Sequence, residues 1–291
     1  MSEYSNVLIA LNNILERNSC RLTPIFRGNG AANAAGDSLE FFVKDMFCTG
    51  ASAYSHQIEK EKHYDKYLSW KGNSSNFPDF IIKEGVGVEP KKMNGKGVGN
   101  LALNSSFPKA YIYPDTQNLP IKELIMESQW EKKEIVYVVG NLNEKDDKLY
   151  RLWLAYGNTF IARESIYLDL KESIKEAVVD LPDAIFVDTK EFGRIKKVDP
   201  LGNSNLRLRG MWELSHPEVV FQKYLQMNEI PEDATKINLI ITENEYENLS
   251  NKPDLSRYIN ENRLQVQKIL IPNPNNLEEE ISAYLFEAFT D

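Results

Sequence analysis

The sequence predicts a mixed α/β fold, in which a mixed β-sheet is flanked by helices and followed by an acidic α/β extension. Strand-like and helix-like segments alternate along most of the 291 residues. Hydrophobic residues make up 42% of the chain and aromatic residues 11%, which is ordinary for a protein with a buried core. No apolar segment approaches the roughly 20 residues that cross a bilayer, so we expect no membrane span.

Charge divides the chain into two parts. The net charge is −9, and residues 228–291 hold 13 acidic and 5 basic residues against 30 and 29 in residues 1–227. We interpret residues 1–227 as the core and residues 228–291 as an acidic α/β extension of the same domain. The N-terminal segment has no basic region followed by a small-residue cleavage site, so we expect no secretory leader, and the two cysteines are too few for a disulfide framework or a zinc motif. The expected compartment is the cytoplasm.

Two amphipathic helices open the order of elements. Leu8, Leu11 and Leu15 recur at helical spacing near the N-terminus. A second helix is expected after Asp37 or Ser38, since either side chain can cap it. Its apolar face consists of Leu39, Phe42, Val43, Met46 and Phe47. Asp45, on the same helix, is interpreted as a surface acid.

A β-hairpin is predicted next, from strands at 77–83 and 86–93 joined by a tight turn at Glu84-Gly85. A glycine-rich loop, residues 94–100, follows it. Further strands are expected at 134–139, 149–156, 159–161, 184–187, 206–212, 236–242 and 264–271. Further helices are expected at 168–179, 217–226 and 277–289.

The hairpin carries the residues that suggest chemistry. Glu89 and Lys91 are two apart on one strand and therefore share a face, while Asp79 opens the other strand. Carboxylates that hold a hard divalent cation, beside a lysine that orients water, suit phosphodiester hydrolysis. Pro90 points to the opposite face but offers its carbonyl to the same cation. The pattern alone fits equally well a solvated hairpin in which Glu89 and Lys91 simply pair.

A resemblance favours the chemical interpretation. FPDFIIKEGVGVEPKKMNGKG, followed by LALNSSFPKAYIYPD, resembles the active-site region of PD-(D/E)XK restriction endonucleases, closest to the NgoPII and NgoBV type. The helix AANAAGDSLEFFVKDMF is similar to theirs, and DPLGNSNLRLRGMWELSHP echoes them weakly. The resemblance implies a PD-(D/E)XK nuclease core with Asp79, Glu89 and the Pro90 carbonyl on Mg²⁺, and Lys91 as the catalytic lysine. Glu40 matches an additional acid that such folds direct into the site.

Pro90 departs from the family pattern, which has an apolar residue between the glutamate and the lysine. Proline lacks the N–H that a central strand would use. Either the strand is locally unpaired at this point, or the alignment of Glu89 is incorrect.

Separate residues are candidates for binding DNA. Arg207 and Arg209 alternate on one predicted strand, and arginine is the usual bidentate partner of guanine. A strand whose arginines pair with Asp199 or Glu213 is the alternative. The remaining candidates for DNA contact are Asn203, Asn205, Asn104, Ser105, Ser106, Lys109, Lys92 and Arg27.

The resemblance implies a type II restriction endonuclease that makes Mg²⁺-dependent double-strand breaks at a short, G/C-rich palindrome. A homodimer on double-stranded DNA and a cognate DNA methyltransferase are expected with it. Three alternatives remain. The first is a PD-(D/E)XK nuclease of repair or recombination without strict sequence specificity, and the second is a non-catalytic DNA-binding protein of the same fold. The third is a plain α/β interaction domain whose acidic C-terminal part contacts another protein.

Overall fold

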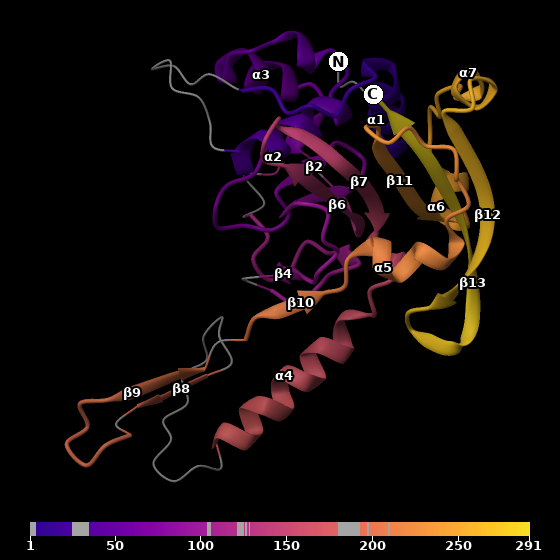
Figure 1. Ribbon diagram of the computed structural model, residues 1–291. Coiled ribbons are helices and arrows are strands. Elements are labelled where there is room, and N and C mark those ends of the chain that lie inside the picture. The colour runs from indigo at the N-terminus through magenta and orange to yellow at the C-terminus, as the bar shows by residue number, and fades with distance from the viewer. Residues whose placement is uncertain are drawn as a thin grey trace.

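The computed structural model of the chain contains one large mixed sheet flanked by helices, which confirms the predicted fold class (Figure 1). The described residues are 4–24, 35–103, 106–120, 125, 127, 129–179, 193–196, 198–208 and 210–291. Within them, no helix has the length and apolar character to cross a membrane.

The helical and extended segments follow one another along the chain. The helices are α1 (Val7–Arg17), α2 (Ala35–Phe47), η1 (Ala51–Ala53), α3 (Gln57–Tyr64), η3 (Gly157–Thr159), α4 (Glu164–Val179), α5 (Pro217–Phe221), η4 (Gln222–Tyr224), α6 (Glu243–Asn248) and α7 (Ser256–Asn260). The strands are β1 (Leu68–Trp70), β2 (Phe80–Ile82), β3 (Gly87–Asn94), β4 (Leu101–Leu103), β5 (Tyr111–Ile112), β6 (Lys133–Asn143), β7 (Lys148–Tyr156), β8 (Gly193–Lys196), β9 (Asn205–Leu208), β10 (Trp212–Leu214), β11 (Thr235–Thr242), β12 (Leu264–Asn273) and β13 (Asn276–Thr290).

The large sheet has the strand order β1-β2-β3-β6-β7-β11-β13-β12, with β5 also paired to β6. The pairs β3–β6 and β7–β11 are parallel, and the other neighbours are antiparallel. The acidic C-terminal residues therefore supply β11, β12 and β13 to the same sheet that contains the β2–β3 hairpin.

Both faces of the sheet are covered, and β6 shows this directly. Val136 and Val138 belong to one buried cluster, together with residues of α1 and α2. Ile135, Tyr137 and Val139 belong to the second cluster, on the opposite face, together with Phe221 of α5. A strand buried on both faces reads as a continuous apolar run, as the sequence of β6 does.

The N-terminal helices form largely as predicted. In α1, Leu8, Leu11 and Leu15 are buried, and the Asn6 side chain caps the helix by accepting the N–H groups of Leu8 and Ile9. Helix α2 buries its predicted apolar face, but it begins at Ala35. The prediction that Asp37 or Ser38 caps this helix is therefore wrong, because both residues lie inside it.

Asp45 is a second correction on α2, because it is a buried acid and only 4% exposed. Its carboxylate pairs with the Lys60 ammonium at 2.5 Å and accepts the Tyr64 hydroxyl at 2.7 Å. Burial raises the pKa of Asp45, although Lys60 and Tyr64 oppose that shift. The sequence around Asp45 gives no sign of this burial, because both partners of its carboxylate lie on a different helix, α3.

Several predicted elements have different forms in the structure. Residues 159–161 form no strand, since the 3-10 turn η3 ends at Thr159 and irregular backbone follows. The strand predicted at 206–212 is divided between β9 and β10, and the helix at 217–226 is divided between α5 and η4. The strand predicted at 184–187 lies outside the described residues. The other predicted strands, and the helix at 168–179, are present with shifted ends.

The prediction of a helix at 277–289 is wrong, because these residues form most of β13. Leucine, glutamate and alanine favour helices in isolation. Pairing with β11 on one side and β12 on the other overrides that preference. Consequently Glu278, Glu279 and Glu280 are exposed strand residues rather than the first turn of a helix.

An arm extends from the sheet. Figure 1 shows α4 and the β8–β9 hairpin reaching away from the layers of helix and sheet.

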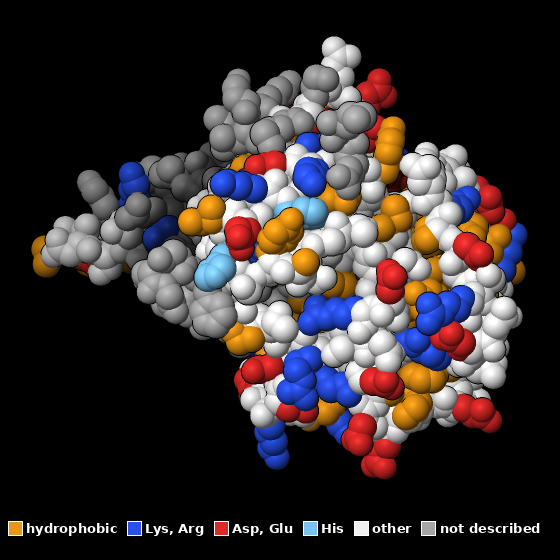
Figure 2. Space-filling model, turned by 90° about the horizontal axis from the view of Figure 1, so that it is seen from above, with side chains coloured by type: hydrophobic (Ala, Val, Ile, Leu, Met, Phe, Trp, Pro, Cys, Tyr) orange, Lys and Arg blue, Asp and Glu red, His pale blue; other side chains and the backbone are white. Residues whose placement is uncertain are grey.

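On the face of the molecule drawn in Figure 2, basic and acidic side chains are interspersed. The uneven charge of the sequence therefore produces no one-signed field on that face.

Candidate active site

The predicted hairpin is present and its packing is tight. Strands β2 and β3 pair antiparallel, with Phe80 opposite Val88 and Ile81 opposite Gly87. A Cβ atom at Gly87 would lie 2.8 Å from the Pro78 ring and 2.7 Å from the Ile135 side chain. Gly87 thus allows Pro78 to pack closely on β3, directly before Asp79.

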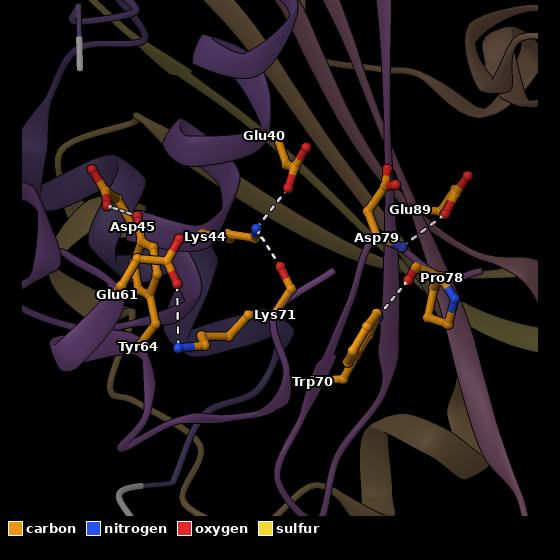
Figure 3. A network of polar contacts seen from close by, with 10 residues as sticks. All are labelled: Glu40, Lys44, Asp45, Glu61, Tyr64, Trp70, Lys71, Pro78, Asp79 and Glu89. Carbon is orange, nitrogen blue, oxygen red and sulfur yellow. Dashed lines mark hydrogen bonds and ion pairs between the residues drawn. The ribbon is translucent and has the colours of Figure 1, made fainter. Parts of the chain in front are cut away.

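Asp79 and Glu89 are neighbours in the structure. The Asp79 backbone N–H donates to Glu89 Oε2 at 3.1 Å, and Lys91 Nζ donates to Glu89 Oε1 at 2.6 Å. Figure 3 shows Asp79 directly before its strand, beside Glu89 of β3. The sequence prediction that these three side chains come together agrees with this geometry, although Asp79 precedes β2 instead of lying within it.

Pro90 lies in β3 without disrupting it. The pairing of β3 with β2 ends at Val88, whereas its pairing with β6 continues through Pro90 opposite Val138. On the β2 side, the strand is therefore unpaired at the proline, as one of the two sequence-based alternatives required. The Glu89–Lys91 spacing is preserved.

The carboxylates of Asp79 and Glu89 repel one another. Burial, followed by the charge of Glu89, raises the pKa of Asp79 to about 8. Lys91 and Lys44 oppose this increase, and the charge of Glu40 adds to it. Two carboxylates held this close in a partly dry site repel one another, and a cation between them would relieve that repulsion.

These groups open into a pocket of about 750 Å³ that is continuous with solvent. Asp79, Glu89 and Lys91 line it, together with Tyr137 of the neighbouring strand. The rest of its wall comes from residues 73–77, 102–103, 106–107 and 118. A pocket that is open to solvent and lined by two carboxylates and a lysine can admit a phosphate group together with a metal ion.

Comparison with known proteins identifies the family. The model of the NgoPII restriction endonuclease family matches residues 5–272. The chain belongs to the NgoPII restriction endonuclease family. It is 34% identical to the type II restriction enzyme NgoPII of Neisseria gonorrhoeae over 271 residues, which is 93% of this chain and 95% of that enzyme. No solved structure matches the chain significantly.

The donor set of this NgoPII-family chain fits a magnesium-type cation. Asp79 and Glu89 offer oxygen ligands, and Pro90 adds a carbonyl within the same strand. Among the described residues, no three histidine, cysteine, aspartate or glutamate side chains gather as a metal-binding group. Mg²⁺ is commonly held by one or two carboxylates and completes its shell with water and phosphate oxygens, so two carboxylates suffice.

Glu40 is near Asp79 but does not belong to the group of Asp79, Glu89 and Lys91 that lines the pocket. It does not line the pocket, and its carboxylate pairs with Lys44 Nζ at 2.6 Å (Figure 3). Lys44 is buried and also donates to the Lys71 carbonyl at 2.7 Å. Since the Glu40 charge raises the pKa of Asp79, the two acids interact through space. A direct catalytic role for Glu40 stays a prediction.

The predicted DNA-contacting residues of the NgoPII-family chain occupy different environments. Lys92 of β3 is exposed, as are Asn203, Asn205 and Arg207 at the β8–β9 hairpin. Ser106 lines the pocket. Arg27, Asn104, Ser105 and Arg209 lie outside the described residues.

Lys109 lies behind the pocket wall. It is 3% exposed, and its ammonium donates to Ser106 Oγ and lies 4.0 Å from the centre of the Phe107 ring. Burial lowers the pKa of Lys109 to about 8. In this arrangement Lys109 supports Ser106 instead of presenting an exposed charge to a phosphate.

The two acids suggested as partners of Arg207 have other contacts. The Asp199 carboxylate accepts the backbone N–H groups of Leu201 and Ser204. The hydrogen bond from the Ser204 N–H is the main cause that lowers the pKa of Asp199. Glu213 accepts the Asn100 amide at 3.0 Å.

Sequence reasoning missed Tyr137 as a site residue. Its hydroxyl accepts the Lys109 N–H at 2.9 Å and donates to the Lys109 carbonyl at 3.2 Å. Alternation within β6 separates Tyr137 from Val136 and Val138, but only the parallel register puts it opposite Glu89. No short-range pattern in the sequence specifies that register.

Proposed function

We propose that the chain is a type II restriction endonuclease that makes Mg²⁺-dependent double-strand breaks at a short, G/C-rich palindromic DNA site. The observation that carries this proposal is the meeting of Asp79, Glu89 and Lys91 in one open pocket. Membership of the NgoPII restriction endonuclease family supports it.

Each of these residues has a part in the proposed hydrolysis. Asp79, Glu89 and the Pro90 carbonyl would hold Mg²⁺, which supplies positive charge to the scissile phosphate when bound. Burial favours the neutral form of Lys91, but Glu89 and Asp79 together outweigh it and raise the pKa of Lys91. Lys91 is therefore an ammonium at neutral pH, able to orient the attacking water and to donate to a phosphate oxygen.

Sequence reading is assigned to the β8–β9 hairpin. Arg207 is exposed on β9, and its guanidinium is suited to the N7 and O6 atoms of guanine in the major groove. Asn203 and Asn205 are neighbouring candidates for base or phosphate contact. The location of this hairpin on an arm supports the assignment, because an arm can reach into a groove while the sheet remains at the backbone (Figure 1).

Arg207→Ala should reduce discrimination between the cognate duplex and a duplex with one substituted guanine by roughly 1–3 kcal/mol, because it removes a bidentate base contact. Equilibrium binding to both duplexes, measured in Ca²⁺ at one fixed salt concentration, would test this. An equal loss of affinity for both duplexes would assign Arg207 to phosphate contact instead.

The proposed biological setting follows from the proposed reaction. An enzyme that cuts a short palindrome also threatens the DNA of its own cell, so we place it in the cytoplasm beside a cognate DNA methyltransferase. Two chains acting on a two-fold symmetric site would cut both strands.

The direct test is digestion of plasmid DNA with Mg²⁺, followed by sequencing of the ends. We expect discrete fragments with one shared end sequence, and no cutting by Asp79→Ala. A smear of fragments would favour a nuclease of repair or recombination. No cleavage with any divalent metal would favour a non-catalytic DNA-binding protein.

A further inference from the structure

The glycine-rich segment after the catalytic strand, Gly95–Asn100, is a basic part of an acidic protein. We refer to it as the glycine loop. Residues 90–114 contain no aspartate or glutamate and four lysines, although the chain has a net charge of −9. Lys92 and Lys96 are exposed at this loop. Neither pairs with an acid among the described residues, and the Lys96 ammonium lies 5.0 Å from the centre of the Tyr150 ring. An anionic partner is the natural complement of such a segment.

The fold does not itself require glycine at two positions of the loop. A Cβ atom added at Gly97 would meet nothing within 4 Å, and one at Gly99 would meet only the end of Met93 at 3.8 Å. Neither residue has the positive φ angle that favours glycine, whereas Gly95 has a φ of 74°. Glycine costs conformational entropy on folding, so its presence without an internal reason suggests that a ligand closely approaches the backbone.

A buried asparagine orients the loop. Asn141 of β6 is fully buried, and its Nδ2 group donates to the carbonyls of Gly95 at 3.0 Å and Gly97 at 2.7 Å. These two carbonyls are thereby turned toward the protein. Within the described part of the chain, the N–H groups of Gly97 and Gly99 donate no backbone hydrogen bond. Backbone N–H groups that point outward beside lysines form an anion-binding surface.

His216 holds the asparagine in this orientation. Its Nδ1 atom accepts the Glu218 N–H at 3.0 Å, so the ring proton resides on Nε2, which donates to Asn141 Oδ1 at 3.0 Å. Burial lowers the pKa of His216 to about 4, which keeps the ring neutral at ordinary pH. The Asn141 amide is therefore fixed with its NH₂ group toward the loop.

The loop follows the strand of the candidate catalytic residues and is joined to β10, the strand that comes after the arm in the chain. Asn94 lies three residue steps beyond Lys91 in β3, a distance of about 10 Å along a strand. This is roughly three base-pair steps of 3.4 Å along one DNA strand. At its other end, the loop is joined to β10 by the Asn100–Glu213 hydrogen bond and by the pairing of β4 with β10.

We propose that the glycine loop binds the sugar–phosphate backbone of DNA a few nucleotides from the scissile bond, through the N–H groups of Gly97 and Gly99 and the Lys96 ammonium. Asn141 is the positioning residue that turns the loop outward. This inference rests on the proposed DNA-cleaving function, and it assigns to that function a contact surface separate from the catalytic carboxylates and from Arg207.

Gly97→Val tests the proposal, because a valine side chain has space in the free protein but would occupy the position of the phosphate. Binding of the wild type and the variant to a fluorescent cognate duplex would be measured in Ca²⁺, together with the midpoint of thermal unfolding. We expect at least a tenfold loss of affinity and an unchanged midpoint. Unchanged affinity would overturn the proposal.

Lys96→Met provides a second test that does not alter the loop backbone. It should reduce the slope of log affinity against log salt by about 0.9, since it removes one phosphate contact. Lys62→Met, the same change at an exposed position of α3, is the matched control and should leave the slope unchanged. An equal slope for Lys96→Met and the wild type would count against the proposal even if Gly97→Val failed to fold.

Different results would contradict the proposed DNA cleavage and the proposed binding of DNA by the glycine loop. Wild-type protein that binds no duplex DNA would overturn both the proposed function and the role of the loop. Wild-type cleavage at a defined site, with Gly97→Val and Lys96→Met binding as the wild type does, would overturn the role of the loop alone.

Discussion

Glu89 contacts two groups of the candidate site with its two carboxylate oxygens. One oxygen accepts the Asp79 N–H and the other accepts the Lys91 ammonium. The same carboxylate therefore orients the turn that precedes β2 and keeps the lysine charged. Its 7% exposure makes these contacts stronger than they would be on the surface, because water competes less for both donors.

Lys91→Met should reduce the rate of DNA cleavage by 10²- to 10⁴-fold, the usual contribution of one positioned proton-transfer or hydrogen-bonding group. Single-turnover cleavage at saturating enzyme would isolate this step from binding. Lys62→Met is the control, because it removes the same charge from the surface of α3. A Lys91→Met enzyme that cuts at the wild-type rate would remove Lys91 from the mechanism.

Short-range spacing placed Glu89 and Lys91 on one strand face, and the family resemblance then singled them out together with Asp79. Glu89 and Lys91 share a strand face because their separation is two, and this relation survives any tertiary arrangement. Asp45 illustrates the opposite case. Its burial depends on Lys60 and Tyr64 of another helix, which no spacing around residue 45 reveals.

At the scale of elements, β13 is the largest departure from the sequence-based prediction. It lies between β11 and β12, and most of its second half is buried. The local sequence favours a helix, but eight residue pairs with β11 and ten with β12 hold it extended. The hairpin of β2 and β3 was predicted correctly because a tight turn and two short apolar runs are local features.

Two leucines of β13 provide a test of its packing. Leu285→Ala should reduce the free energy of unfolding by about 2–5 kcal/mol, since Leu285 is fully buried. Leu277→Ala should change it by less than about 0.5 kcal/mol, since that side chain is 88% exposed. Urea unfolding of both variants would make the comparison. Equal losses of stability would contradict the strand that the structure describes.

For the whole molecule, the sheet joins the hairpin of the candidate active site to the acidic C-terminal residues. β7 pairs with β11 in parallel, so residues 235–290 continue the sheet that contains β3 and β6. The arm formed by α4, β8 and β9 extends from this sheet (Figure 1). The described residues of one chain thus provide one candidate active site and one arm.

We expect two chains to bind one cognate duplex, because one site of this kind cuts one strand and a palindrome presents two equivalent half-sites. Sedimentation of the complex in Ca²⁺ would give its mass, with a duplex of unrelated sequence as the control. A complex of one chain and one duplex that still yields double-strand breaks would contradict this expectation.

The sequence by itself determined the fold class, the two N-terminal helices and the hairpin that carries Asp79, Glu89 and Lys91, because periodicity, turn residues and two-residue spacing act over short distances. Only the tertiary structure decided that β13 is a strand, that Asp45 is buried and that Tyr137 lies opposite Glu89. Each of those outcomes depends on pairing between segments distant in the chain, and the free energy of such pairing resides in contacts that local sequence does not specify.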